Sequence, residues 1–202
     1  MTEIPPPGPA QEALLRAALL RSAVELLCLQ PWDFVTVQDI AAQAGMAPTV
    51  FRRYFKSREL LLAEIMQTFA TRWIDTATQW FGAVRTPDDL CATTSALMRF
   101  LATCESEARI FFLSSIGAPS SVEEIRADSH RQLVYAAIEA VRRIAPQRST
   151  SDAQVSGVAL VALYELAARS QVGMDEPFRV LGPMGFHDEL TGMTRIAAGF
   201  AA

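Results

Sequence analysis

The sequence has few of the residues that catalysis, metal binding or disulfide bonding require. Its two histidines, His130 and His187, lie far apart, and no spacing typical of a metal site occurs. It has no glycine-rich phosphate loop with a lysine, no dinucleotide fingerprint and no plausible pair of nucleophile and base. These absences predict a protein that is not an enzyme and that uses neither a metal nor a cofactor.

Long apolar runs are also missing, because charged residues interrupt each run well before the ~20 residues that a membrane helix needs. Residues 1–12 contain no basic segment followed by an apolar one, so we expect no signal peptide. The three cysteines, Cys28, Cys91 and Cys104, fall in helical patterns, as small buried residues of a reducing compartment do. We therefore expect a cytoplasmic protein without membrane contact.

No strand-like alternation of apolar and polar residues is found, whereas apolar residues recur with a helical period along most of the chain. The pattern predicts an all-α fold of about nine helices. Residues 1–9, rich in proline, are expected to form a disordered arm, and residues 173–185 a loop. Ser57, Thr86 and Ser120 or Ser121 are expected helix caps. The expected helices are 11–29, two short helices within 36–55, 58–81, 87–104, 107–116, 120–144, 151–172 and 187–200.

The segment 35–55 carries the most specific pattern in the chain. Thr36 can cap a short helix while Asp39 reaches back to it, as in a capping box. Gly45 suits the positive φ that ends such a helix, and Pro48 suits the first turn of the next one. This is the arrangement of a helix-turn-helix, in which the second helix enters the major groove of DNA.

Positive charge gathers in the same region of an otherwise acidic chain. The formal net charge is −4, yet residues 46–58 include Arg52, Arg53, Lys56 and Arg58 and no acid. Screening confines each charge to about 8–10 Å, so phosphate binding depends on the local field. By itself this cluster would indicate only a solvated surface; beside a helix-turn-helix it predicts a DNA-binding patch.

Residues 10–70 resemble the TetR family of bacterial transcription regulators. The likeness rests on Phe34-Val35-Thr36-Val37, Asp39-Ile40-Ala41, Ala44-Gly45-Met46, Tyr54-Phe55 and Arg58. It implies a long fourth helix, then about five helices that bind a small molecule and form the dimer. The resemblance therefore implies a DNA-binding domain at 10–57, with the helix-turn-helix at about 36–55, and an effector-binding and dimerisation domain at 58–202.

The resemblance also implies roles for single residues. Thr36, Tyr54 and Arg58 would contact phosphates, and Thr49 would lie at the groove-facing start of the recognition helix. Ala47 replaces the usual hydroxyl-bearing cap, and Arg52 replaces a usual tyrosine; this arginine could hold a phosphate or read a guanine edge. The expected DNA contacts are Thr36, Pro48, Thr49, Arg52, Arg53, Tyr54, Lys56 and Arg58.

The later helices contain aromatic and methionine side chains at helical spacing, which line either the core or a largely apolar effector pocket. Glu165 lies on an apolar helix, where it either pairs with Arg169 one turn on or faces the ligand. The candidate pocket residues are Trp73, Trp80, Met98, Phe111, Phe112, Tyr135, Tyr164 and Glu165.

Two of the later segments combine small and large apolar residues, which allow helices to approach closely in a four-helix dimer interface. Ordinary packing within one chain is the alternative. The candidate interface residues are Gly157, Leu160, Val161, Tyr164, Ala168, Met193, Ile196 and Phe200.

Together these features predict a homodimeric, ligand-responsive regulator of transcription. We expect a repressor that binds a palindromic operator in double-stranded DNA and is released by a small hydrophobic or aromatic effector. The alternative is a helical ligand-binding or scaffolding protein that has lost DNA binding, which the acidic balance and Ala47 leave open.

Overall fold

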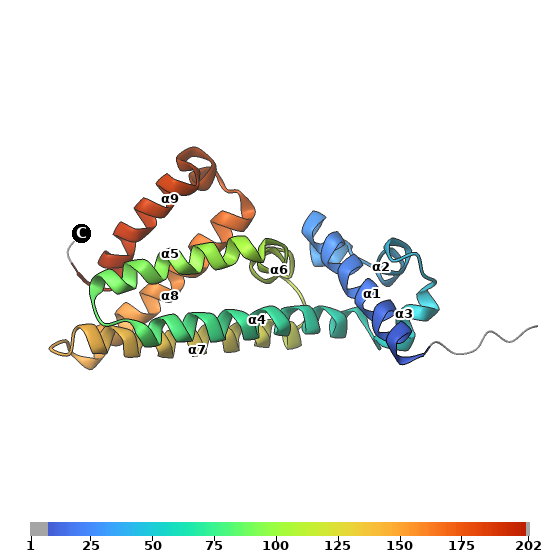
Figure 1. Ribbon diagram of the computed structural model, residues 1–202, viewed down its shortest axis with the longest axis horizontal. Coiled ribbons are helices and arrows are strands. Elements are labelled where there is room, and N and C mark those ends of the chain that lie inside the picture. Colours follow the sequence, from blue (N-terminus) through green and yellow to red (C-terminus); the bar gives the residue numbers. More distant parts are fainter. Residues whose placement is uncertain (1–7, 201–202) are drawn as a thin grey trace, which may run out of the picture.

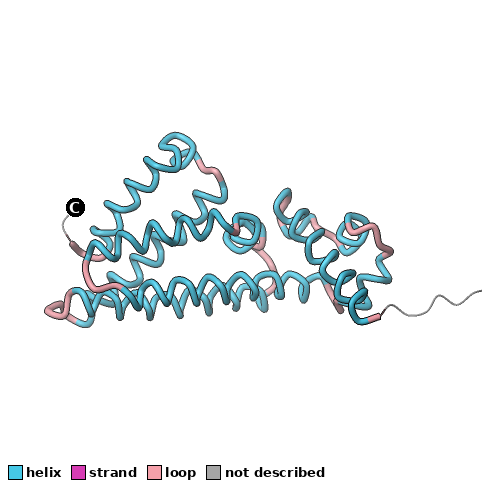
Figure 2. Tube along the Cα trace, in the orientation of Figure 1, coloured by secondary structure: helices cyan, strands magenta, loops and turns pink. Residues whose placement is uncertain are grey.

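The computed structural model describes residues 8–200, and within that range the regular structure is entirely helical, with no strand (Figure 2). The predicted all-α fold is confirmed. The proposed arm at 1–9 falls mostly outside the described residues, although α1 already begins at Pro9. The helices are α1 (Pro9–Leu29), α2 (Val37–Gln43), α3 (Pro48–Tyr54), α4 (Arg58–Ala83), α5 (Pro87–Thr103), α6 (Glu105–Arg109), α7 (Ser120–Ile144), α8 (Thr150–Gly173) and α9 (Glu176–Ala197).

Helix α4 connects two parts of the molecule (Figure 1). Helices α1, α2 and α3 form a head at its first residues, and α5 to α9 form a body along the rest of its length. Within the body α4 packs against α7, α7 against α8, and α9 against both α5 and α8. The head therefore lies at one end of an elongated body, and α4 belongs to both.

Side-chain caps begin several helices where the sequence predicts them. Thr86 and Asp89 form a capping box at α5, and the Ser57 hydroxyl accepts a hydrogen bond from the Leu60 amide at α4, over 3.3 Å. The predicted serine cap of α7 is wrong, because Pro119 is the residue before that helix and Ser120 is already its first residue. A helix begins there without a side-chain acceptor for its free amides.

The predicted loop at 173–185 is also wrong, since α9 begins at Glu176. Gly182 has a φ of 67° and a ψ of 171°, and Pro183 follows it, so α9 bends sharply there. Glycine tolerates this φ and proline lacks the amide that would continue the helix, and together they redirect the chain. Helical structure resumes directly, because the second half of α9 packs on α5 and α8.

The predicted helix at 107–116 consists of α6 followed by a π-helical turn, Ile110–Ser114. This turn places Phe111 and Phe112 in a buried aromatic cluster with Phe69 and Trp73 of α4. Ring centroids lie 5.0 Å apart for Phe69 and Phe111, and 5.9 Å apart for Trp73 and Phe112. The cluster is one of the contacts that hold α4 in the body, beside the packing of α4 on α7.

The turn before α2 and the cysteines differ in burial. The aromatic pair Trp32 and Phe34 could anchor α1 onto the next two helices, but only Trp32 is buried, and Phe34 is 68% exposed. Cys104 is buried, whereas Cys28 and Cys91 are only half-buried. Both half-buried thiols lie at helix surfaces against other segments, Cys28 near the Ser106 carbonyl and Cys91 near the Thr191 carbonyl.

Helices α7 and α8 lie close together at Gly157. A Cβ there would lie 2.4 Å from the Ile138 Cγ1 and 2.9 Å from the Ile138 backbone nitrogen, which cannot move away. We expect Gly157→Ala to lower the free energy of unfolding by about 1–3 kcal/mol, measured by urea denaturation.

Gly192 is the matched control, because it is also helical and a Cβ there meets no atom within 4 Å. Gly192→Ala should leave stability unchanged or raise it by up to about 1 kcal/mol. Equal effects at the two positions would contradict the close α7–α8 contact.

Candidate nucleic-acid interface

The local geometry of α2 and α3 follows from a few residues of the turn between them. Thr36 and Asp39 form the predicted capping box, in which the Thr36 hydroxyl donates to the Asp39 carboxylate at 2.6 Å. These hydrogen bonds hold the pKa of Asp39 below its usual value. Gly45 has the expected positive φ, 68°, and the Met46 amide donates to the Ala41 carbonyl at 2.8 Å. Ala47 precedes α3 without a side-chain cap, as expected.

Helix α3 divides into a buried face and an exposed face. Phe51 and the following Phe55 are buried with their ring centroids 5.6 Å apart, and the Arg16 guanidinium of α1 lies 4.8 Å from the centroid of the Phe55 ring. The exposed residues of this segment are Pro48, Thr49, Arg52, Arg53 and Lys56. Arg52, Arg53 and Lys56 thus lie on one solvent-facing surface, and Arg58, the fourth cation of the predicted patch, does not.

The cations on this exposed face differ in their partners. Arg53 donates to the Glu12 carboxylate of α1 at 2.6 Å. Arg52 and Lys56 make no ion pair or side-chain hydrogen bond with any residue of the described range. Their positive charge is therefore fully available to a ligand, whereas that of Arg53 is partly compensated.

Two residues expected to contact phosphate make internal contacts. Tyr54 is half-buried, and its hydroxyl is buried without a hydrogen-bond partner among the described residues. The Thr36 side chain is exposed, but its hydroxyl is already engaged with Asp39. Tyr54 could reach a phosphate only if its hydroxyl left this buried position, and Thr36 only if its hydroxyl gave up a hydrogen bond with Asp39.

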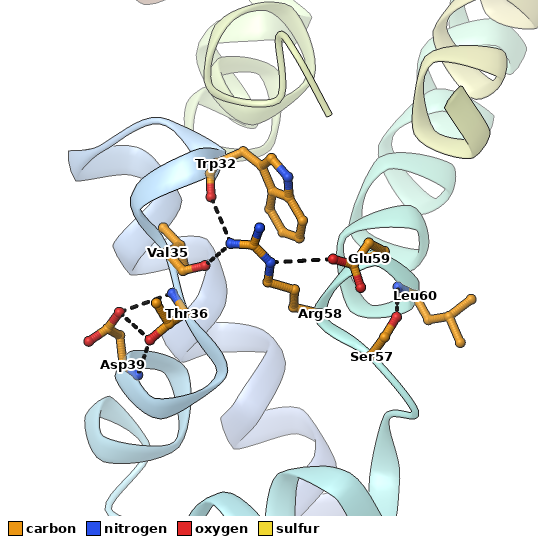
Figure 3. Close-up of polar contacts among 8 residues, drawn as sticks. All are labelled: Trp32, Val35, Thr36, Asp39, Ser57, Arg58, Glu59 and Leu60. Carbon is orange, nitrogen blue, oxygen red and sulfur yellow. Dashed lines mark hydrogen bonds and ion pairs between the residues drawn. The ribbon is translucent and has the colours of Figure 1, made fainter. Parts of the chain in front are cut away.

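Arg58 is directed into the head from the first turn of α4 (Figure 3). Its Nη1 donates to the carbonyls of Trp32 and Val35, its Nε donates to Glu59 at 3.3 Å, and its guanidinium lies 4.2 Å from the Trp32 ring centroid. The side chain thus joins α4 to the loop before α2. Sequence reasoning missed this role, because the partners are backbone carbonyls more than twenty residues away.

The head also contacts the body beyond α4. Arg109, at the end of α6, donates through Nε to the Cys28 carbonyl of α1 at 3.1 Å and through Nη1 to the Val172 carbonyl of α8 at 2.6 Å. The last turn of α1 is thereby linked to the last turn of α8 through one side chain.

The proposed effector residues lie in several different places. Trp73, Phe111 and Phe112 belong to the buried aromatic cluster, and the space between Trp73 and Tyr164 has no volume for a water molecule. Tyr135 is 71% exposed on α7. Met98 lines an open cleft of about 270 Å³. Trp80 lines a different open cleft of about 340 Å³.

Two polar side chains of this set have partners in the body. Glu165 accepts a hydrogen bond from His130 Nδ1 of α7 at 3.0 Å, a partner that neither sequence alternative, pairing with Arg169 or facing a ligand, names. Tyr164 is fully buried, and its hydroxyl lies 2.9 Å from Thr94 Oγ1. Burial raises the pKa of Tyr164, since it disfavours the phenolate.

The proposed dimer residues divide between core and surface. Gly157, Leu160, Val161, Tyr164 and Ala168 are buried within this chain. Met193 and Ile196 of α9 are exposed, and Phe200 is half-buried. The exposed apolar residues of α8 are instead Val155, Val158 and Leu166.

The described residues form an all-α structure, with a helix-turn-helix head on a helical body. The family model described as bacterial regulatory proteins, tetR family, matches residues 19–65, which cover the second half of α1, all of α2 and α3 and the start of α4. The head of the chain is thus similar to the TetR family over the residues that this model matches.

Solved structures agree over nearly the whole chain. A TetR-like transcriptional regulator from Rhodococcus sp. RHA1 matches with a TM-score of 0.70 and 17% identity, covering 98% of this chain and 100% of the other. The regulator FadR from Bacillus subtilis, in complex with stearoyl-CoA, matches with a TM-score of 0.67 and 16% identity, covering 92% and 99%.

The fatty acid degradation regulator FadR from Bacillus halodurans has a TM-score of 0.67 and 15% identity, covering 96% and 97%. At such identities these likenesses show a shared fold. No curated protein matches the sequence. Among the described helices, none is long and apolar enough to cross a membrane.

Arg58 and Arg52 provide a matched pair of variants, since one arginine is bonded inside the head and the other has no partner in the described range. We expect Arg58→Met to lower the free energy of unfolding by about 1–3 kcal/mol, because it removes the side-chain donor to the Val35 carbonyl and the second donor to the Trp32 carbonyl, which keeps the Val35 amide. Arg52→Met should change it by less than about 0.5 kcal/mol. Urea unfolding of both variants measures the difference, and an unaffected Arg58→Met would contradict the linking role.

Proposed function

We propose that the protein is a homodimeric DNA-binding regulator of transcription that acts as a repressor, released from a palindromic operator by a small, largely apolar effector. The observation that carries the proposal is the exposed face of α3 beside a capped helix-turn-helix, where Arg52 and Lys56 have no partner among residues 8–200. In such proteins the second helix lies in the major groove. Because the chain as a whole is negatively charged, attraction to phosphate depends on local cations such as these.

Each residue of the proposed interface would have a defined role. Lys56 and the α2 start at Thr36 would lie against phosphates, which set the position of the head without reading sequence. Thr49 and Arg52 would reach base edges, since both are exposed on the first turns of α3. Arg53 would join them once DNA competes with Glu12 for its guanidinium. Arg58 and Tyr54 would act mainly by shaping the head.

Dimerisation would bring two heads to half-sites about 34–36 Å apart, one turn of the duplex. The exposed apolar side chains of α8, at positions 155, 158 and 166, share one helical face, and Met193 and Ile196 of α9 are exposed as well. Exposed apolar side chains that cluster on a surface are typical of a protein–protein interface. We propose that these residues, in place of their buried neighbours, form the contact between subunits.

The effector would bind in the body and change the relative position of the two heads. Helix α4 is the main mechanical link, because Arg58 joins it to the head and the aromatic cluster joins it to the body. A coupling of this kind is worth about 1–3 kcal/mol, or about 5–150-fold in DNA affinity.

Duplex binding tests the proposal directly. Fluorescence anisotropy should show saturable binding to DNA from upstream of the protein's own gene, weakening as salt rises. Lys56→Gln should weaken binding to this DNA and to random duplex alike and lower the slope of log K against log salt by about one.

Arg142→Gln is the control, since it removes the same charge from the last turn of α7, in the body. It should leave binding unchanged. If neither DNA binds at low salt, the protein is the alternative, a helical ligand-binding or scaffolding protein.

The oligomeric state tests the proposed interface. Val158→Asp combined with Leu166→Glu should convert the dimer to a monomer in analytical ultracentrifugation, because two buried charges would face each other without partners. Leu14→Glu is the control, since Leu14 is 70% exposed on α1, in the head. A dimer that survives the double substitution would place the interface elsewhere.

A further inference from the structure

A cleft of about 270 Å³ opens between α5, the end of α8 and the first half of α9. Its walls are mainly apolar and include Met98 of α5 and Phe178, Met184 and Phe186 of α9. This volume lies just below the range of about 300–1,000 Å³ that is usual for ligand sites, so only a small molecule fits.

The break in α9 creates this cleft. Gly182 and Pro183 redirect the chain, and residues from both sides of them, Phe178 before and Phe186 after, line the cleft. Met184, directly after the break, lines the cleft and is 82% exposed. An apolar side chain so placed at the rim gains burial when an apolar ligand covers it.

The polar groups of the cleft point to the charge of the ligand. Arg99 lines it and makes no ion pair or side-chain hydrogen bond within the described range. No described lining residue carries a carboxylate. A carboxylate or another small anionic group is therefore the partner that Arg99 lacks, and a cationic ligand would be repelled.

The remaining polar side chains are already paired and hold the walls together. His187 Nε2 lies 2.9 Å from the Ser95 hydroxyl, which itself donates to the Cys91 carbonyl at 3.2 Å. Because the single hydroxyl proton of Ser95 goes to that carbonyl, His187 is the donor in their bond. Gln171 Nε2 donates to the Met98 carbonyl at 3.2 Å and joins α8 to α5.

We propose that this cleft binds a small amphipathic carboxylate, whose apolar part contacts the α9 side chains and whose carboxylate pairs with Arg99. Gln171 precedes Val172, the residue whose carbonyl accepts from Arg109, and Arg109 also bonds α1. A ligand that moves the end of α8 therefore acts on the head through Arg109. The binding step stands alone, and the effect on DNA rests on the proposed function.

Calorimetric titration of the full chain with octanoate, 1-octanol and octylammonium tests the binding step. Octanoate should saturate at one molecule per chain and bind at least about tenfold more tightly than octanol, because a charge-assisted hydrogen bond contributes about 1.5–3 kcal/mol. Octylammonium should bind most weakly. Equal affinity of octanoate and octylammonium, or no saturation with octanoate, would overturn the proposal.

Two variants locate the site. Arg99→Gln should weaken octanoate at least about tenfold and leave octanol unchanged, and Ala102→Trp should abolish both, because Ala102 lines the cleft and is exposed enough to carry an indole. Arg142→Gln removes the same charge elsewhere and should alter neither. Octanoate affinity that survives Arg99→Gln or Ala102→Trp would place the ligand outside this cleft.

The DNA readout separates this proposal from the proposed function. Octanoate should change duplex affinity at least about fivefold, and Arg109→Lys should remove that change while still binding octanoate. An unchanged affinity in the unmodified protein would overturn the link through Arg109. If the protein binds no DNA at all, the proposed function fails, and the calorimetry still decides whether the cleft is a site.

Discussion

The structure depends on α4, one continuous helix that must be held at both ends by different parts of the molecule. At its start, Arg58 bonds to the carbonyls before α2 and lies over Trp32, while Glu64 pairs with Arg16 of α1. Farther along, Phe69 and Trp73 are buried against the π-helical turn. Because a helix transmits displacement along its length with little compression, the position of the head is tied to packing in the body.

The same constraint explains why the head presents one particular face. Phe51 and Phe55 are buried inside the head, and the exposed side chains of α3 and the residues directly after it are those at 48, 49, 52, 53 and 56. Arg52, Arg53 and Lys56 give this face its positive charge, whereas the chain as a whole is negatively charged. The proposed DNA contact and the fold of the head therefore follow from the same few residues.

Local signals predicted the head well. The capping box at Thr36, the positive φ at Gly45 and the proline at 48 each act within four or five residues, so a sequence pattern contains all the participants. The start of α4 at Ser57 and the start of α5 at Thr86 were predictable for the same reason.

Features that depend on distant partners were not predictable in this way. Gly182 and Pro183 resemble loop residues, and only packing on α5 and α8 keeps helix on both sides of them. Helical spacing does not show which side of α8 faces its own chain, and so Leu160 and Val161 were assigned to a surface that Val158 and Leu166 occupy. Likewise, the partners of Arg58 and Glu165 come from segments far along the chain.

The central claim is that the exposed face of α3 meets duplex DNA. Amide hydrogen exchange of the full chain, with and without a saturating operator duplex, tests this claim most directly. The account predicts that added protection centres on residues 36–58 and is strongest in α3. Protection confined to α7, α8 or α9, with α3 exchanging as in the free protein, would contradict it.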